Sequence, residues 1–126
     1  MVQRILVVDD EPHIRDVICF ALERAGMVPT TARNGTEAMM AFRRGNIDLI
    51  ILDIGMPDMD GYEVARRIRA KEGEHRTKLV ALTGFGQAED ARRAREAGFD
   101  QHLVKPAAME ALKALLVGME NGVSRE

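Results

Sequence analysis

The segment ILVVDDEP (residues 5–12) sets four apolar residues directly before three carboxylates and a proline. A continuous apolar run, without alternation of polar residues, is typical of a strand that is covered on both faces, as in a parallel sheet. Three negative charges at the end of such a strand need a partner, because like charges side by side repel one another. The segment therefore predicts a buried parallel strand that ends at a charged site.

Further strands are predicted along the chain. Residues 49–52 (LIIL) and 78–82 (KLVAL) have the same apolar character, whereas residues 28–32 (VPTTA) and 101–104 (QHLV) suit edge strands, where a proline is tolerated. Helix-period segments follow each strand, at residues 13–26, 35–46, 60–73, 88–98 and 108–120. In the first helix we expect Ile14, Val17, Ile18 and Leu22 to face the core. This order predicts an α/β fold, a doubly wound (βα)5 three-layer sandwich with a five-stranded parallel sheet.

Length and composition limit the class of protein. The chain has 126 residues, a net charge of −2, one cysteine and no tryptophan. We expect one domain over residues 1–120 and a polar tail or linker stub over residues 121–126. The near-neutral charge gives no electrostatic reason to expect direct nucleic-acid or membrane binding, and no apolar run approaches the roughly 20 residues of a membrane span. The single Cys19 reads as a small core residue and, with no disulfide partner, predicts a cytoplasmic location.

Polar side chains follow four of the five predicted strands. Asp9 and Asp10 follow the first, Asp53 follows the third, Thr83 the fourth and Lys105 the fifth. Ligands of open α/β sheets bind outside the carboxyl ends of the strands, so these side chains should converge at one edge. That convergence makes this edge the candidate site.

Some of these acids also have structural explanations. Asp10 could cap the first helix, because Pro12 suits a first helical turn. Asp58 and Asp60 are best explained as turn and cap residues before the third helix, where Asp60 and Glu63 have the spacing of a capping box. Asp53 lies too far from the next helix to cap it, and an unpaired buried carboxylate is costly. Asp53 therefore needs a chemical role.

Repulsion within the expected cluster of Asp9, Asp10 and Asp53 is relieved only where protons or a cation intervene, and a hard divalent cation resolves it. Mg²⁺ (or Mn²⁺) suits oxygen ligands and, together with Lys105, would balance the three negative charges. A site neutralised in this way is ready for a phosphoryl group, to which Asp53 could act as a nucleophile while Thr83 donates a hydrogen bond. The first strand is not followed by a glycine-rich loop, so nucleotide or flavin binding lacks its usual support.

The motifs VVDDE (7–11), LDIGMPDMDGYE (52–63), ALTG (81–84) and HLVKP (102–106) occur in an order and spacing that resemble a bacterial two-component response-regulator receiver domain. The resemblance covers about residues 4–119. It implies a flavodoxin-like sheet with strand order 2-1-3-4-5, in a stand-alone regulator or in the receiver of a hybrid histidine kinase.

The resemblance also implies roles for individual residues. Asp53 would accept a phosphoryl group from a phosphohistidine of a sensor histidine kinase or phosphotransfer protein. Asp10, Asp53 and the backbone carbonyl of Gly55 would ligate Mg²⁺, with Asp9 acting through water. Thr83 and Lys105 would bind the phosphoryl oxygens. Gly55 and Phe85 stand at positions that modulate the lifetime of the acyl phosphate.

Switching would couple Thr83 to His102, which stands where the family often has Tyr or Phe. His102 could act as the rotating ring or be a half-exposed polar residue of an edge strand. The output surface would be the fourth helix, fifth strand and fifth helix, about residues 87–120. The downstream protein effector is not indicated, and the resemblance allows a monomer or a phosphorylation-promoted homodimer.

Two rival functions differ in class. A haloacid-dehalogenase-type phosphatase also forms an aspartyl phosphate, but it carries its nucleophile after the first strand as D-x-D. In this chain the adjacent pair Asp9–Asp10 follows the first strand, and the lone Asp53 follows the third. We therefore expect no enzyme activity beyond the domain's own phosphorylation and dephosphorylation. A receiver-like module that acts only by protein contact, without phosphorylation, is the other alternative. Its prediction is that no phosphoryl group is accepted.

Overall fold

The computed structural model describes residues 4–55, 60–71, 76–83 and 88–104. Within these ranges strands and helices alternate, as predicted. The elements are β1 (Arg4–Val8), α1 (Pro12–Arg24), β2 (Val28–Ala32), α2 (Gly35–Arg43), β3 (Leu49–Asp53), α3 (Gly61–Lys71), β4 (Lys78–Thr83), α4 (Ala88–Ala97) and β5 (Gln101–Val104). The helix predicted over residues 108–120 and the tail at 121–126 lie outside the described residues.

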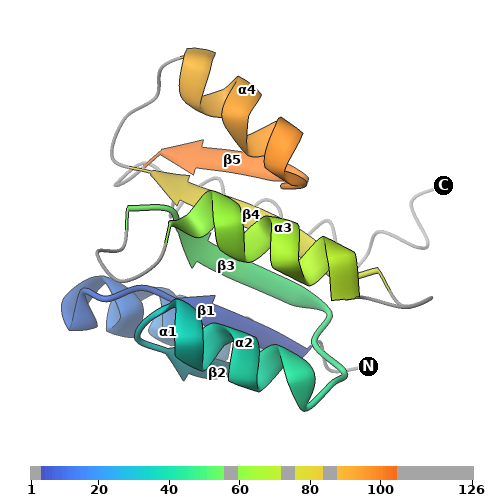
Figure 1. The fold of residues 1–126 in the computed structure, drawn as a ribbon. Helices are drawn as coiled ribbons and strands as arrows, with labels where there is room; N and C mark the ends of the chain where they lie inside the picture. Colours follow the sequence, from blue (N-terminus) through green and yellow to red (C-terminus); the bar gives the residue numbers. More distant parts are fainter. Residues whose placement is uncertain (1–3, 56–59, 72–75, 84–87, 105–126) are drawn as a thin grey trace, which may run out of the picture.

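The five strands form one parallel sheet in the order β2-β1-β3-β4-β5, which confirms the expected topology (Figure 1). β1, β3 and β4 occupy the centre and are almost fully buried, as their continuous apolar sequences require. β3 and β4 each run one residue further than predicted. Asp53 and Thr83 are therefore the last residues of their strands rather than the first residues after them.

Two hydrophobic clusters cover the two faces of the sheet. Leu6, Ile50 and Ala81 belong to the cluster that includes residues of α2, α3 and α4. Ile5 and Ile51 belong to the other cluster, to which α1 contributes Ile18 and Leu22. Successive strand residues point to opposite faces, so each central strand contributes to both clusters. This division produces the helix–sheet–helix layering of the predicted sandwich.

The start and the outer face of α1 differ from expectation. Glu11, not Asp10, is the N-cap, and its side chain accepts a hydrogen bond from the backbone N–H of His13. The interpretation of Asp10 as the cap of α1 is therefore wrong, and its carboxylate remains available to the site. Val17 was expected in the core but is 40% exposed, because the buried stripe of α1 is narrower and centres on Ile18 and Leu22.

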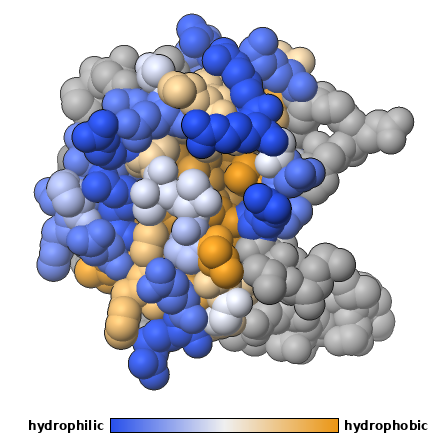
Figure 2. Space-filling model, turned by 90° about the horizontal axis from the view of Figure 1, so that it is seen from below, coloured by the Kyte–Doolittle hydropathy of each residue, from blue (hydrophilic) through white to orange (hydrophobic). Residues whose placement is uncertain are grey.

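Large hydrophobic side chains that stay exposed in the described part of the chain come from α1, β2 and α2, namely Val17, Phe20, Val28 and Met40. Figure 2 looks at the molecule from the β2 side and shows apolar residues gathered between hydrophilic ones. Across the described ranges, none of the helices combines the length and apolar character needed to cross a membrane.

Candidate functional site

Three carboxylates meet at the carboxyl edge of the sheet. β1 and β3 are neighbours with Val8 in register with Leu52, so the next residue of each chain segment, Asp9 and Asp53, falls at the same edge. Carboxylate oxygens of Asp9, Asp10 and Asp53 lie within 4.8 Å of one another. Asp9 is fully buried, Asp53 is 7% exposed, and Asp10 is exposed. The structure thus brings together the three acids that the strand ends indicated.

Short local hydrogen bonds orient two of these carboxylates. Oδ1 of Asp9 accepts from the backbone N–H of Glu11 at 2.9 Å, and Oδ1 of Asp53 accepts from the backbone N–H of Gly55 at 3.0 Å. Each bond spans two residues, as in an Asx turn. These two turns fix the directions of the Asp9 and Asp53 side chains at the edge of the sheet.

Arg15 also belongs to the surroundings of the site, although sequence reasoning did not select it. Its guanidinium donates to the backbone carbonyl of Asp9 at 2.8 Å from the first turns of α1. The signal in the sequence would have been an arginine one helical turn after the Glu11 cap, on the side of the acids. Arg15 holds the end of β1 and places a positive charge near the carboxylates.

The entrance to α3 lies against the residue that follows Asp53. Gly61 is buried, and a Cβ atom at this position would be 2.5 Å from the Cα atom of Ile54. Asp60 caps the helix, as expected, by accepting from the backbone N–H of Tyr62 at 2.9 Å. The carboxylate of Glu63 instead pairs with Arg66 and Arg67, and these hydrogen bonds lower its pKa. Asp58 lies outside the described residues.

Thr83 and His102 lie on adjacent strands. Thr83 is 5% exposed and is in register with Val104, while His102 is in register with Ala81. Because alternate residues of a strand share a face, Thr83 and His102 lie on the same face of the sheet. Thr83 also ends the strand next to β3, where Asp53 is in register with Leu82. Lys105 and Phe85 lie outside the described residues.

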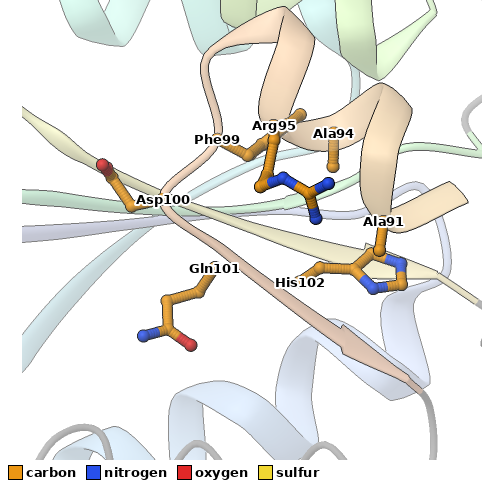
Figure 3. A pocket seen from close by; sticks show the side chains of 7 residues that line it. All are labelled: Ala91, Ala94, Arg95, Phe99, Asp100, Gln101 and His102. Atoms are coloured by element: carbon orange, nitrogen blue, oxygen red, sulfur yellow. The ribbon is translucent and has the colours of Figure 1, made fainter. Parts of the chain in front are cut away.

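A groove of about 200 Å³ lies between α4 and β5. Its lining consists of Ala91, Ala94 and Arg95 from α4 with the segment 99–102. Figure 3 shows the ring of His102 directed toward α4, close to Ala91. The Nε2 atom of this ring is buried and makes no hydrogen bond to the described part of the chain. The groove was not predicted, because it forms between a helix and a strand whose relative placement no local sequence pattern reports.

The donor set of the acidic cluster fits a hard divalent cation. Carboxylate oxygens within 4.8 Å of one another can share one ion, and two of the three side chains that provide them are buried. Buried like charges are costly unless a proton or a cation intervenes, and oxygen ligands favour Mg²⁺ or Ca²⁺ over softer metals. The edge of the sheet therefore carries an acidic cluster whose oxygen donors fit such an ion beside the Asp53 carboxylate.

Comparison with known proteins agrees with this fold. The family model of the response regulator receiver domain matches residues 5–117. The chain is 43% identical to the transcriptional regulatory protein ResD of Bacillus subtilis over 103 residues, 82% of this chain and 42% of ResD. Among solved structures, it resembles response regulator TrrA of Thermotoga maritima in complex with Mg²⁺–BeF, with a TM-score of 0.79, 40% identity, and coverage of 90% of this chain and 96% of that one.

A second solved structure shows a receiver with a partner. It contains the receiver domain of Ssk1 and the histidine phosphotransfer protein Ypd1 of Saccharomyces cerevisiae, with a TM-score of 0.81, 26% identity, and coverage of 88% of this chain and 83% of that one. The chain belongs to the response-regulator receiver family. It spans less than half the length of ResD.

Proposed function

We propose that residues 1–120 act as the phosphoacceptor domain of a two-component system or phosphorelay, with Asp53 as the acceptor. The carrying observation is the meeting of three carboxylates at the edge of the sheet, with oxygens within 4.8 Å, at the end of a strand adjacent to Thr83. A purely structural role would not explain why a buried strand ends beside a cluster of negatively charged side chains. Metal-assisted phosphoryl transfer explains it.

In the proposed reaction an Asp53 carboxylate oxygen attacks the phosphorus atom of a phosphohistidine. The new O–P bond forms as the P–N bond breaks, and the leaving nitrogen keeps the electron pair and takes up a proton. Bound Mg²⁺ or Mn²⁺ would neutralise charge on the transferred group. Asp10, Asp53 and the Gly55 carbonyl would ligate the ion, and Asp9 would act through water. Thr83 and Lys105 would hold the phosphoryl oxygens.

The proposed donor is a sensor histidine kinase or a phosphotransfer protein. The Ssk1–Ypd1 structure supports this class of partner for a receiver of the same fold. The exposed Val17 and Phe20 of α1, which begins directly beside the acids, offer an apolar surface to such a protein.

The proposed location is the cytoplasm, because kinase domains and reduced thiols such as Cys19 are found there.

The output of phosphorylation would pass through Thr83 and His102 to the surface formed by α4 and β5. The two residues share a face of the sheet, and the His102 ring lies beneath α4 (Figure 3). A protein effector or a second copy of the chain would read this surface. The domain would act on no substrate other than its own acyl phosphate, which it would form and hydrolyse.

Incubation with acetyl phosphate and Mg²⁺, followed by intact-protein mass spectrometry, tests the proposal. We expect one added phosphoryl group, lost on chelation of the metal before incubation and in the variant Asp53→Asn. Asp60→Asn is the matched control, because asparagine also caps helices well and Asp60 is outside the cluster. Absence of phosphorylation in the wild-type chain, with a folded protein, would instead support the module that acts by protein contact alone.

A further inference from the structure

Helix α4 is anchored to the domain by small apolar side chains. In the part of α4 whose side chains are described, the buried residues are Ala94 and Ala97. Helix α3 buries the larger Tyr62, Val64 and Ile68. The favourable free energy of burial scales with apolar area, so alanine methyl groups fix a helix less firmly than large side chains do. Polar contacts at the carboxyl-terminal end and in the middle of α4 therefore carry a large share in fixing its position.

The carboxyl-terminal end of α4 is held by a cluster that we name the Arg69 clamp, formed by Arg69, Thr77, Gly98 and Asp100. Arg69 of α3 donates to the carbonyls of Gly98 and Thr77 at 2.9 and 2.7 Å and to Oδ2 of Asp100 at 2.8 Å. The Asp100 carboxylate also accepts from the backbone N–H of Leu79 at 2.8 Å. These bonds tie the turn after α4 to both α3 and β4.

The middle of α4 is held to α3 by a different contact. The guanidinium carbon of Arg93 lies 4.3 Å from the centroid of the Tyr62 ring, well inside the range of a cation–π interaction. Arg93 is exposed on α4, whereas Tyr62 is 6% exposed in the first turn of α3. This single contact between an exposed cation and a ring is easier to break than the several hydrogen bonds of the Arg69 clamp.

Tyr62 is mechanically linked to the acidic site. It follows Gly61, whose backbone packs so closely against Ile54 that no Cβ atom fits between them. Ile54 follows Asp53 directly, and its N–H donates to the carbonyl of Leu82 on β4. A shift of the backbone after Asp53 must therefore be transmitted through Gly61 to the first turn of α3 and the Tyr62 ring.

We propose that Tyr62 and Arg93 form a latch that couples occupancy of the Asp53 site to the position of α4, which turns about its end at the Arg69 clamp. The inference rests on the proposed function, because it assumes that the site takes up a phosphoryl group. Turning α4 about this end changes the groove lined by Ala91, Ala94 and His102 (Figure 3). By thermodynamic linkage, a change in the latch also changes the affinity of the site for its ligand.

The chain contains its own reporter for this latch. Tyr62 is the single tyrosine and the chain has no tryptophan, so the intrinsic tyrosine fluorescence of the protein reports on Tyr62. The probe ligand is beryllofluoride with Mg²⁺. Arg93→Gln removes the cation from the ring. Arg92→Gln removes an equal charge from the preceding residue, which pairs with Glu96 on the surface. Bound beryllofluoride is measured independently by ¹⁹F NMR.

We expect the probe to change Tyr62 emission equally in the wild type and in Arg92→Gln, and by less than half as much in Arg93→Gln. The affinity of Arg93→Gln for the probe should differ from the wild type by about two- to fivefold, the effect of one exposed cation–π contact. Arg93→Lys keeps the positive charge, so its Tyr62 response and its affinity for the probe should lie between those of the wild type and of Arg93→Gln.

The outcomes separate the latch from the function on which it rests. A bound ¹⁹F signal in all variants with the same Tyr62 response and the same affinity overturns the latch and leaves the proposed function intact. A bound signal in the wild type without any change in Tyr62 emission overturns the latch as well. If the wild type gives no bound ¹⁹F signal and accepts no phosphoryl group, the proposed function fails, and the latch fails with it.

Discussion

Gly61 packs directly against Ile54, so that a Cβ atom on Gly61 would be 2.5 Å from the Ile54 Cα atom. The contact joins the first residue of α3 to the residue that follows Asp53, and it involves backbone on one side. Backbone cannot swing aside as a flexible side chain can. The close approach of α3 to the end of β3 therefore depends on the absence of a side chain at position 61.

Replacing Gly61 by alanine should destabilise the domain. Because the added methyl group meets the Ile54 backbone, we expect Gly61→Ala to lower the free energy of unfolding by about 1–3 kcal/mol. Gly55→Ala is the matched control, since its Cβ atom would make an ordinary contact of 3.6 Å with Oδ1 of Asp53. Urea unfolding measures both, and equal midpoints for the two variants would contradict the prediction.

Mg²⁺ should stabilise the domain through the acidic cluster. Metal bound to the folded state alone raises the free energy of unfolding, by about 1.4 kcal/mol at ten times the dissociation constant. Without metal, Asp10→Asn should raise the melting temperature, because it removes one of three close negative charges. When Mg²⁺ is added, the melting temperature of Asp10→Asn should rise little, because the variant has lost one ligand to the metal. Calorimetry with and without EDTA measures this, and a wild-type melting temperature independent of Mg²⁺ would count against the metal site.

The Arg69 clamp should make stability depend on pH in the acid range. Burial alone would raise the pKa of Asp100, but the hydrogen bonds from Leu79 and Arg76 and the charges of Arg69 and Arg76 hold it below its ordinary value of 3.8. A carboxyl group with a lowered pKa in the folded state contributes stability above its unfolded pKa, and this contribution disappears as the pH falls through the folded pKa.

Asp100→Ala tests the contribution of this carboxylate. It should lower the free energy of unfolding by about 1.5–3 kcal/mol at pH 7, the usual effect of losing hydrogen bonds to a charged group. The difference from the wild type should shrink as the pH falls below 3.8. Glu96→Ala, which removes an exposed pair with Arg92, should cost no more than about 0.5 kcal/mol. A difference that stays constant down to the lowest pH at which both proteins fold would refute the role of the Asp100 charge.

His102 should be replaceable by phenylalanine without loss of stability. Its Nε2 atom is buried and makes no hydrogen bond to the described residues, and a buried polar atom without a partner is costly. We expect His102→Phe to change the free energy of unfolding by about 0 to 1 kcal/mol, in the stabilising direction. Thermal unfolding measures the change. A loss of more than 1 kcal/mol would show that the imidazole has a partner that stabilises it.

The sequence alone determined the fold class, the parallel sheet and the residues that end its strands. Continuous apolar runs such as residues 5–8 report burial on both faces, and parallel strands bring their carboxyl ends to one edge whatever the details of packing. Asp53 was therefore placed correctly beside Asp9 and Asp10, and the predicted strand order of the receiver family is the order observed. These features depend on local pattern and topology, which a linear sequence records.

The tertiary structure decided what depends on distances between elements. The role of Glu11 rather than Asp10 as the cap of α1, and the exposure of Val17, follow from the exact path of the chain and the width of the buried stripe. The contact of Gly61 with Ile54, the Arg69 clamp and the ring of Tyr62 under Arg93 join residues between 7 and 31 positions apart. No periodic pattern encodes such contacts, because they depend on how separate elements pack against one another in three dimensions.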